Sequence, residues 1–368
     1  MKAARTTRRF LVAVAMLLLL TACGAEGGAS PDGEPAGGGT PAGGDDTAPA
    51  GTEAEGGGDP TPVRVASILS GQAGYLTALV EHMGLGEEHG LDLEVTDLGF
   101  VEAANALRQD RADVALMSVS SIVSLRGEQG FESVIVGPSN WSGNAWVVRE
   151  DAPYEDFADL QGERIGNFPR TTGAFFFSAV LADAMDLSIE DDFDSVEADV
   201  SALVALLENG EVEAVNLFEP HVSKLLTIGG YRVLLDFDEF FEELMGARPL
   251  KATYAATPQW IEENPDTVEA VQAVLAEAIE AIKSGADEEF FRDNADELFG
   301  LTTAEQVDAG FERNRLSYVG PDEWREGDVE VQNQILQEGI DLGLLPEPPE
   351  DWQEDMWLDC YYEQCPSG

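Results

Sequence analysis

Short apolar runs that suit β-strands alternate with helical patterns from Pro62 onward, and this alternation restricts the possible folds more than any other feature of the sequence. Such alternation is typical of βαβ units, in which helices cover a mostly parallel sheet. After Pro258 the pattern becomes mainly helical up to about Gly343. We therefore expect an α/β protein with a helical C-terminal part. The predicted strands cover residues 63–69, 91–95, 113–117, 131–136, 144–148, 164–167, 212–217, 231–237 and 251–255.

The first 23 residues predict export. A basic stretch at residues 2–9 precedes an apolar run at residues 10–20, which is too short to span a bilayer. Residues 20–23 (Leu-Thr-Ala-Cys) resemble the bacterial lipobox, which implies that Cys23 carries lipid and begins the mature chain. An ordinary signal peptide with an unmodified cysteine is the alternative. Residues 24–61, rich in Gly, Pro and acidic residues, have little to bury and predict a disordered tether.

The charge of the chain excludes one large class of partners. The formal net charge is −51, from 71 acidic and 20 basic residues. Nucleic acid requires a basic surface, and anionic lipid would repel this chain if it lay flat on a membrane. The acidity predicts a solvated, salt-tolerant surface, and we expect a small-molecule solute as the partner instead of nucleic acid.

The cysteines and histidines are few. Apart from Cys23, the chain has Cys360 and Cys365, and an exported protein favours a disulfide between them. None of the three histidines shows ligand spacing to these cysteines, so no metal site is expected. The sequence also lacks phosphate-loop and dinucleotide motifs, and we expect no cofactor.

Five short motifs, in this order and spacing, resemble the nitrate/sulfonate/taurine and thiamine-pyrimidine-precursor branch of the periplasmic-type binding proteins. The resemblance spans residues 63–285 and fades after about Gly300. The motifs are ADVAL at 112–116, LQGERIG at 160–166, LLENGEVEA at 206–214, FEP at 218–220 and TPQWI at 257–261.

This resemblance implies a type II periplasmic-binding-protein fold, in which two lobes with mixed, mostly parallel sheets enclose a hinged cleft. Lobe one would comprise residues 62–145 plus 246–368, and lobe two residues 146–245. The implied function is the extracytoplasmic solute-binding component of an ABC importer. Its partners would be a permease and an ATPase, and the protein would be a monomer held at the cell membrane by a lipid anchor.

Candidate site residues lie where strands end and helices begin. Ligands of open α/β sheets bind outside the carboxyl ends of strands, where helix N-termini favour anions. In lobe one these positions hold two groups of residues. Without a ligand, the first group would only form a tight turn, and the second would only cap a helix. The groups are Ser70, Gln72 and Tyr75 after the first strand, and Ser118, Ser120 and Ser121 after the third.

In lobe two, Arg170, Thr171, Thr172 and Gly173 lie between a strand and an apolar helix. An arginine can grip a sulfonate or a carboxylate with two hydrogen bonds. The alternative is an exposed arginine beside a capping threonine.

Four further residues are candidates. The resemblance implies crossings between the lobes near residues 145–148 and 251–255. Asn216 and Glu219 close the next strand, and Glu219 could bind a ligand amine or only favour a helix N-terminus. Trp141 and Asn144 precede the first crossing, where a tryptophan could stack on a ring or cage a cation, or belong to the core.

Catalysis is not expected. An enzyme would need a nucleophile–base pair, a metal cluster or a cofactor motif, and the cysteine-rich signature of the related thiamine pyrimidine synthase is absent. An anionic solute fits Arg170 and the helix N-termini. A cationic or aromatic solute (a pyrimidine, for example), held by Trp141, Tyr75 and Glu219, and a ligand sensor on the same scaffold are the alternatives.

Overall fold

The computed structural model describes residues 59–325, 327–353 and 355–358. The predicted signal peptide (1–23), nearly all of the predicted tether (24–61), and Cys23, Cys360 and Cys365 lie outside the described residues. The lipid anchor and the disulfide therefore stay predictions.

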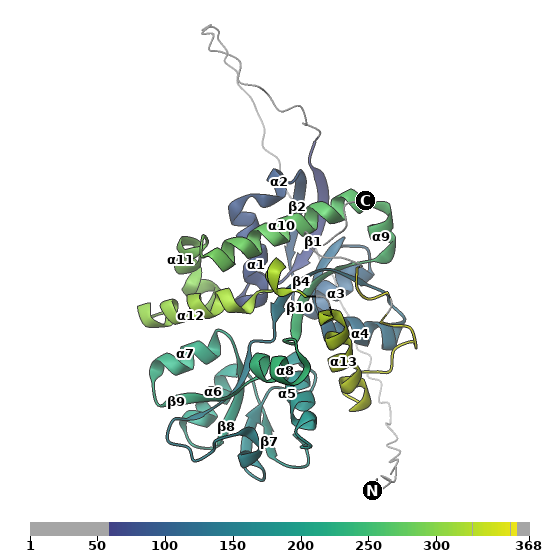
Figure 1. Cartoon of the computed structure of the whole chain (residues 1–368). Coiled ribbons are helices and arrows are strands. Elements are labelled where there is room, and N and C mark those ends of the chain that lie inside the picture. The colour runs from purple at the N-terminus through teal and green to yellow at the C-terminus, as the bar shows by residue number, and fades with distance from the viewer. Residues whose placement is uncertain (1–58, 326, 354, 359–368) are drawn as a thin grey trace, which may run out of the picture. The chain divides into compact units, whose positions relative to one another are not determined.

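Two five-stranded sheets organise the described chain (Figure 1). In sheet one the strand order is β2-β1-β3-β10-β4; β1 pairs in parallel with β2 and β3, and β10 is antiparallel to both β3 and β4. Its strands are β1 (Thr61–Ser67), β2 (Leu91–Asp97), β3 (Val114–Ser118), β4 (Val134–Trp141) and β10 (Leu250–Ala256).

Sheet two repeats this arrangement. Its order is β7-β6-β8-β5-β9, with β6 parallel to β7 and β8, and β5 antiparallel to β8 and β9. The expected α/β class with mixed sheets is confirmed. The strands are β5 (Asn144–Arg149), β6 (Arg164–Asn167), β7 (Asp194–Glu197), β8 (Ala214–Phe218) and β9 (Tyr231–Asp236).

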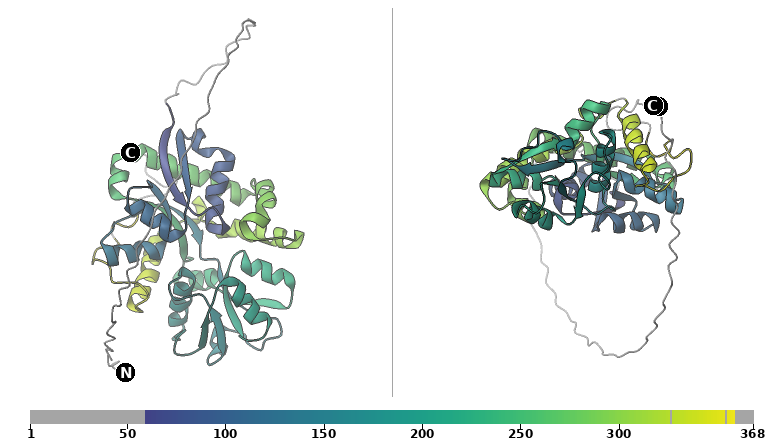
Figure 2. Two further views of the ribbon diagram at one scale, coloured as in Figure 1. Left: turned by 180° about the vertical axis from the view of Figure 1, so that it is seen from behind. Right: turned by 90° about the horizontal axis from the view of Figure 1, so that it is seen from below.

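Helices cover both sheets. Helix α10 packs on α1, and it crosses in front of β1 in Figure 1 and lies behind the strands in the reverse view of Figure 2. We call sheet one with α1–α4 and α9–α13 lobe one, and sheet two with α5–α8 lobe two. The helices of lobe one are α1 (Gly71–Met83), α2 (Leu85–Glu88), α3 (Phe100–Arg108), α4 (Val119–Gln129), α9 (Pro258–Glu263), α10 (Pro265–Ser284), α11 (Glu288–Phe299), α12 (Ala304–Ser317), η2 (Pro321–Glu323) and α13 (Asp328–Asp341). Those of lobe two are η1 (Phe157–Leu160), α5 (Gly173–Ala184), α6 (Val200–Glu208), α7 (His221–Ile228) and α8 (Phe237–Met245).

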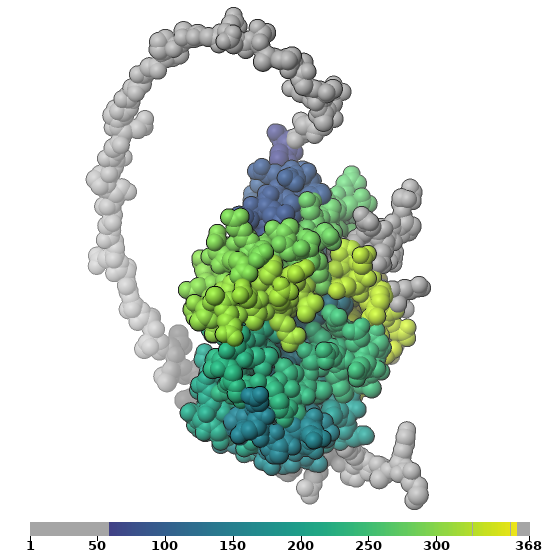
Figure 3. Space-filling view, turned by 60° about the vertical axis from the view of Figure 1, so that its left-hand side comes forward, coloured from purple at the N-terminus to yellow at the C-terminus, as the bar shows by residue number. Residues whose placement is uncertain are grey.

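The chain passes between the lobes twice through short connections. Strand β4 ends at Trp141 and β5 begins at Asn144, while α8 ends at Met245 and β10 begins at Leu250. The lobes also touch through helices, because α12 packs on α7 and α13 packs on α5. In Figure 3 the yellow-green surface of this C-terminal part meets the green and teal surface of lobe two.

Local patterns failed at several places. Strand β7 (Asp194–Glu197) was not predicted, because it is a four-residue edge strand with charged residues at both ends. A strand was expected to continue to Phe237, but Asp236 caps α8 there by accepting bonds from the Asp238 and Glu239 amides. Among the described residues, no helix has the length and hydropathy that a bilayer span requires.

Candidate functional site

A cavity of about 400 Å³ lies between the lobes, and we call it the cleft cavity. Helix α4 of lobe one and helix α5 of lobe two both present their N-terminal ends to it. Half of the ligand-site residues predicted from the sequence line it. They are Ser118, Ser120, Ser121, Arg170, Thr171, Thr172 and Gly173.

The start of α4 brings three hydroxyl groups together. Ser118 is the N-cap, and its Oγ accepts a bond from the Ser121 amide at 3.1 Å. The same Oγ lies 3.2 Å from Ser120 Oγ and also contacts Ser121 Oγ. Because a helix N-terminus carries a partial positive charge and unpaired N–H groups, this end of α4 favours an anion.

The start of α5 is built in the same way. Thr172 is the N-cap, its Oγ1 accepts from the Phe175 amide at 3.2 Å, and it donates to Pro169 O at 2.8 Å. The 12-residue helix that follows is almost wholly buried on its first two turns, so its N-terminal end is held rigidly. Two helix N-termini from different lobes therefore face one cavity.

Arg170 brings a full positive charge to the cleft cavity, but this charge already has a partner. The guanidinium forms an ion pair with Glu190 and lies 5.9 Å from the centroid of the Phe175 ring. The Arg170 side chain is 44% exposed. An anion in the cavity would have to share this guanidinium with Glu190 or displace that carboxylate.

The remaining lining is mostly apolar, with one carboxylate, Glu128. Leu344, Leu345 and Pro346 follow helix α13 and were not predicted as site residues. The only local signal near them is Gly343, which precedes them. Its φ of 69° is typical of a glycine that ends a helix, and it indicates where α13 stops. The lining thus combines apolar side chains with polar ones, which also include Asn105, Ser124 and Gln129. The other apolar lining residues are Phe100, Val101, Ala104, Leu125 and Phe176.

Asn144 and Asn216, two predicted site residues, belong to a buried network in lobe two. Asn144 Nδ2 donates to Asn216 Oδ1 at 3.0 Å, and Asn216 Nδ2 donates to Asn167 Oδ1 at 2.9 Å and to Ala174 O at 3.0 Å. All three asparagines are fully buried. Residues 167 and 174 bracket the turn that carries Arg170, so this network holds the turn in place.

The structure places two aromatic side chains that were predicted to bind the solute in the core. Tyr75 is fully buried, and its hydroxyl donates to Asp287 Oδ2 at 2.6 Å. Trp141 is 2% exposed, with its ring centroid 6.2 Å from that of Trp324. Both rings are occupied by protein neighbours, so stacking on a solute does not fit these positions.

Ser70 and Gln72 begin α1, which starts at Gly71 instead of at Tyr75 as expected. Ser70 is the exposed N-cap, without a side-chain cap bond. Gln72 is 5% exposed, and Lys251 Nζ donates to its Oε1 at 3.1 Å. Gln72 therefore contacts the second crossing between the lobes.

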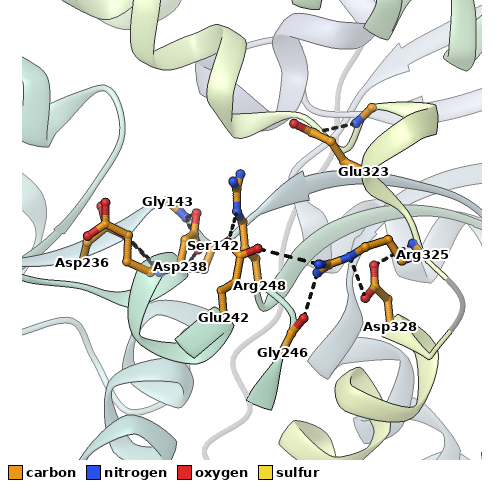
Figure 4. Close-up of polar contacts among 12 residues, drawn as sticks. Ser142, Gly143, Asp236, Asp238, Glu242, Gly246, Arg248, Glu323, Arg325 and Asp328 are labelled. Carbon is orange, nitrogen blue, oxygen red and sulfur yellow. Dashed lines mark hydrogen bonds and ion pairs between the residues drawn. The ribbon is translucent and has the colours of Figure 1, made fainter. Parts of the chain in front are cut away.

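Glu219 lies at a second, smaller cavity of about 120 Å³ beside the crossings, the hinge cavity. Arg313 Nε of α12 lies 3.0 Å from Glu219 Oε1, so this ion pair joins the two lobes. Burial raises the pKa of Glu219. Five acidic side chains and two arginines line the hinge cavity, and Figure 4 shows part of this set. These charged residues are Glu219, Asp236, Asp238, Glu239, Glu242, Arg248 and Arg313.

Asp238 is a second acid of this group whose pKa is raised. Ser142 Oγ donates to its Oδ1 at 2.7 Å, and the Gly143 amide donates to both carboxylate oxygens (Figure 4). Burial, and then the nearby Asp236, raise the pKa of Asp238 to about 6, while burial lowers the pKa of Lys251 to about 8. Charge at this crossing therefore depends on pH near neutrality.

Asp238→Asn should stabilise the protein at pH 8 and have little effect near pH 4. Because the pKa of Asp238 is higher in the folded state than its ordinary 3.8, its contribution favours folding below about pH 4 and is lost as pH rises through about 6. Asparagine keeps the acceptor without the charge, so we expect a gain of about 1–3 kcal/mol at pH 8.

Urea unfolding of both proteins between pH 4 and pH 8 measures this difference. Glu239→Gln, at an exposed neighbour, is the control and should show no such trend. A D238N difference that stays constant across this pH range would contradict the prediction.

Comparison with known proteins shows which family this chain belongs to. The family model described as NMT1/THI5 like matches residues 73–289. A binding protein of Brucella abortus is 25% identical over 224 residues, which are 60% of this chain and 66% of that protein. The chain thus spans just under two thirds of that relative's length.

Solved structures show the same fold at low identity. The periplasmic aliphatic sulphonate binding protein SsuA from Escherichia coli has a TM-score of 0.66 and 18% identity, covering 81% of this chain and 98% of that one. The periplasmic nitrate-binding protein NrtA from Synechocystis has a TM-score of 0.58 and 15% identity, covering 81% and 86%. The two-lobed periplasmic-binding-protein fold expected from the sequence motifs is confirmed.

Proposed function

Because the chain belongs to the NMT1/THI5-like family, we propose that it is an extracytoplasmic solute-binding protein that holds a small anion in the cleft cavity and delivers it to an ABC importer. The anion would be a sulfonate, a nitrate or a carboxylate. The partners would be a permease and its ATPase, and the protein would be a monomer tethered to the membrane through Cys23.

One observation carries this proposal. The N-terminal ends of α4 and α5, from different lobes, border the same cavity together with Arg170. Two partial positive charges then face a single solute, together with the Arg170 guanidinium, which the solute would share with Glu190. The excess negative charge of the whole chain does not oppose this, because exposed charges are screened beyond about 8 Å at physiological ionic strength.

Two similar structures are named for sulphonate and nitrate binding, which supports an anion. Catalysis finds less support, because no histidine is among the described residues that line the cleft cavity. The serine hydroxyls at the start of α4 are bonded to one another and to the helix amide. They serve as oriented donors and acceptors in this proposal.

A cationic or aromatic solute is favoured only by the acidic hinge cavity. Of the three residues expected to hold such a solute, Tyr75 and Trp141 lie in the core and Glu219 is paired with Arg313. The hinge cavity is also less than a third of the size of the cleft cavity. We therefore prefer the anion.

A thermal-shift screen of the exported chain tests the proposal. The panel contains taurine, alkanesulfonates, nitrate, aromatic acids, pyrimidines and betaines. A ligand at 100 times its dissociation constant should stabilise the fold by about 2.7 kcal/mol. Shifts with betaines or pyrimidines and none with any anion would reject the anion assignment.

Arg170→Ala should weaken binding of the best anion at least tenfold, which is about 1.4 kcal/mol. Glu190→Gln should strengthen it several-fold, because this substitution frees the Arg170 guanidinium from its carboxylate partner. Isothermal titration calorimetry measures both. Arg164→Ala is the matched control, because Arg164 pairs with Asp194 at the exposed start of β6. Equal affinities for R170A and the unaltered chain would show that Arg170 does not contribute to anion binding.

A further inference from the structure

A segment after the last described helix lines the cleft cavity. Helix α13 is followed by the C-terminal segment, whose described residues are 342–353 and 355–358 and in which Leu344, Leu345 and Pro346 line the cavity. Leu342 and Leu344 also line an adjoining cavity of about 100 Å³ that Arg170 borders. The family match ends at residue 289, so this wall lies outside the matched part of the chain.

A buried arginine fixes this segment to lobe one. Arg126 of α4 is 5% exposed. Its Nη1 donates to Trp352 O at 3.2 Å, and its Nη2 donates to Asp355 O at 2.9 Å and to Ser133 O at 2.8 Å. A buried guanidinium is unfavourable unless its N–H groups are hydrogen-bonded. Loss of these carbonyl contacts would therefore destabilise the buried Arg126.

Further contacts continue the attachment to lobe one. The Ile135 amide of β4 donates to Met356 O at 2.9 Å, and Trp357 Nε1 donates to Asn333 Oδ1 of α13 at 2.9 Å. The segment also runs close along α4, because a Cβ at Gly127 would lie 3.0 Å from Glu347 O and 3.1 Å from Pro346 Cγ. Helix α4 thus presents its N-terminal hydroxyls to the cavity and, further along, holds the cavity wall.

We propose that Leu344, Leu345 and Pro346 set the length of the solute that the cleft cavity accepts, and that Arg126 is the positioning residue that keeps this wall in place. The inference rests on the proposed anion-binding function. An anion held at the two helix N-termini would direct its apolar part along the apolar lining. Because Leu344 and Leu345 belong to that lining, they would limit how long this part can be.

The probes are straight-chain alkanesulfonates of one to eight carbons, titrated by calorimetry into the exported chain. The unaltered protein should prefer one chain length. Leu344→Ala combined with Leu345→Ala should move this preference at least two carbons longer, because the truncation opens space. Arg126→Met should reduce the discrimination between chain lengths at least fivefold. Preference profiles that coincide with that of the unaltered protein would overturn the inference.

Arg149→Met is the matched control. Arg149 also donates to two backbone carbonyls, those of Leu207 and Val212, but it lies in β5 of lobe two. It should leave the length profile unchanged. If Arg126→Met does not fold, Arg126→Lys keeps the charge with fewer and differently placed donors, and it should show the same loss of discrimination in weaker form.

Hydrogen exchange tests the wall without a ligand. Amides at 119–125 and 350–357 should exchange at least tenfold faster in the Arg126 variant than in the unaltered protein, and Arg149→Met should not change them. Unchanged protection at these amides would overturn the positioning role. If no alkanesulfonate binds the unaltered protein, the sulfonate form of the proposed function fails, whereas exchange still decides the role of Arg126.

Discussion

Asn216→Ala should lower the free energy of unfolding by about 3 kcal/mol or more. The substitution removes three hydrogen bonds, and it leaves the buried Asn144 amide and Ala174 carbonyl without the partners described above. Each buried polar group that loses its partner costs about 1–3 kcal/mol. Because the network holds the turn that carries Arg170, anion affinity should fall as well.

Urea unfolding followed by circular dichroism measures the stability effect. Asn209→Ala is the matched control, because Asn209 is an exposed asparagine at the end of α6 with one long bond of 3.5 Å to Glu211. The control should change stability by about 0.5 kcal/mol or less. Equal losses for N216A and N209A would mean that the network does not stabilise lobe two.

Gly339→Ala should cost about 1–3 kcal/mol of stability and should separate the lobes. A methyl group at this position of α13 would lie 2.0 Å from Phe176 Cε2 and 2.8 Å from its Cζ. Phe176 is buried in α5, and its ring centroid lies 5.2 Å from that of Phe177, so neighbouring side chains restrict its movement on that side. The α13–α5 contact must therefore open.

Small-angle scattering should show a larger radius of gyration for G339A, and thermal unfolding should show a lower midpoint. Gln334→Ala, on the exposed side of the same helix, should change neither quantity. Phe176→Leu introduced together with Gly339→Ala should restore the closed contact, because it removes the atoms that clash. If Gly339→Ala alone matches the parent protein in both measurements, α13 and α5 accommodate the methyl group and their contact does not open.

Much of the secondary structure follows from local sequence. The predicted range 164–167 coincides with β6, and Asp199, a residue type that favours N-caps, caps α6 by accepting a bond from the Ala202 amide. These features depend on residues within a few positions of one another, where backbone preferences and capping bonds decide the conformation. Strand β7 escaped prediction because its pairing with β6, and not its own composition, makes it a strand.

The two helix N-termini of the cleft cavity were also predictable. A serine cluster after β3 and a threonine pair after β6 place hydroxyls at helix starts beyond the carboxyl ends of these strands. The direction in which a side chain points was not predictable. Tyr75 and Trp141 occupy predicted positions near strand ends, yet both turn into the core because large rings gain more from burial there.

The sequence alone therefore determined the α/β class, the family resemblance and the strand ends that carry the anion-binding candidates, since these depend on local periodicity and motif order. Only the tertiary structure decided that Glu190 already holds Arg170, that three asparagines support its turn, and that residues 344–346 wall the same cavity. These contacts join residues that are distant in the chain, and no local pattern encodes which of them meet once the lobes pack together.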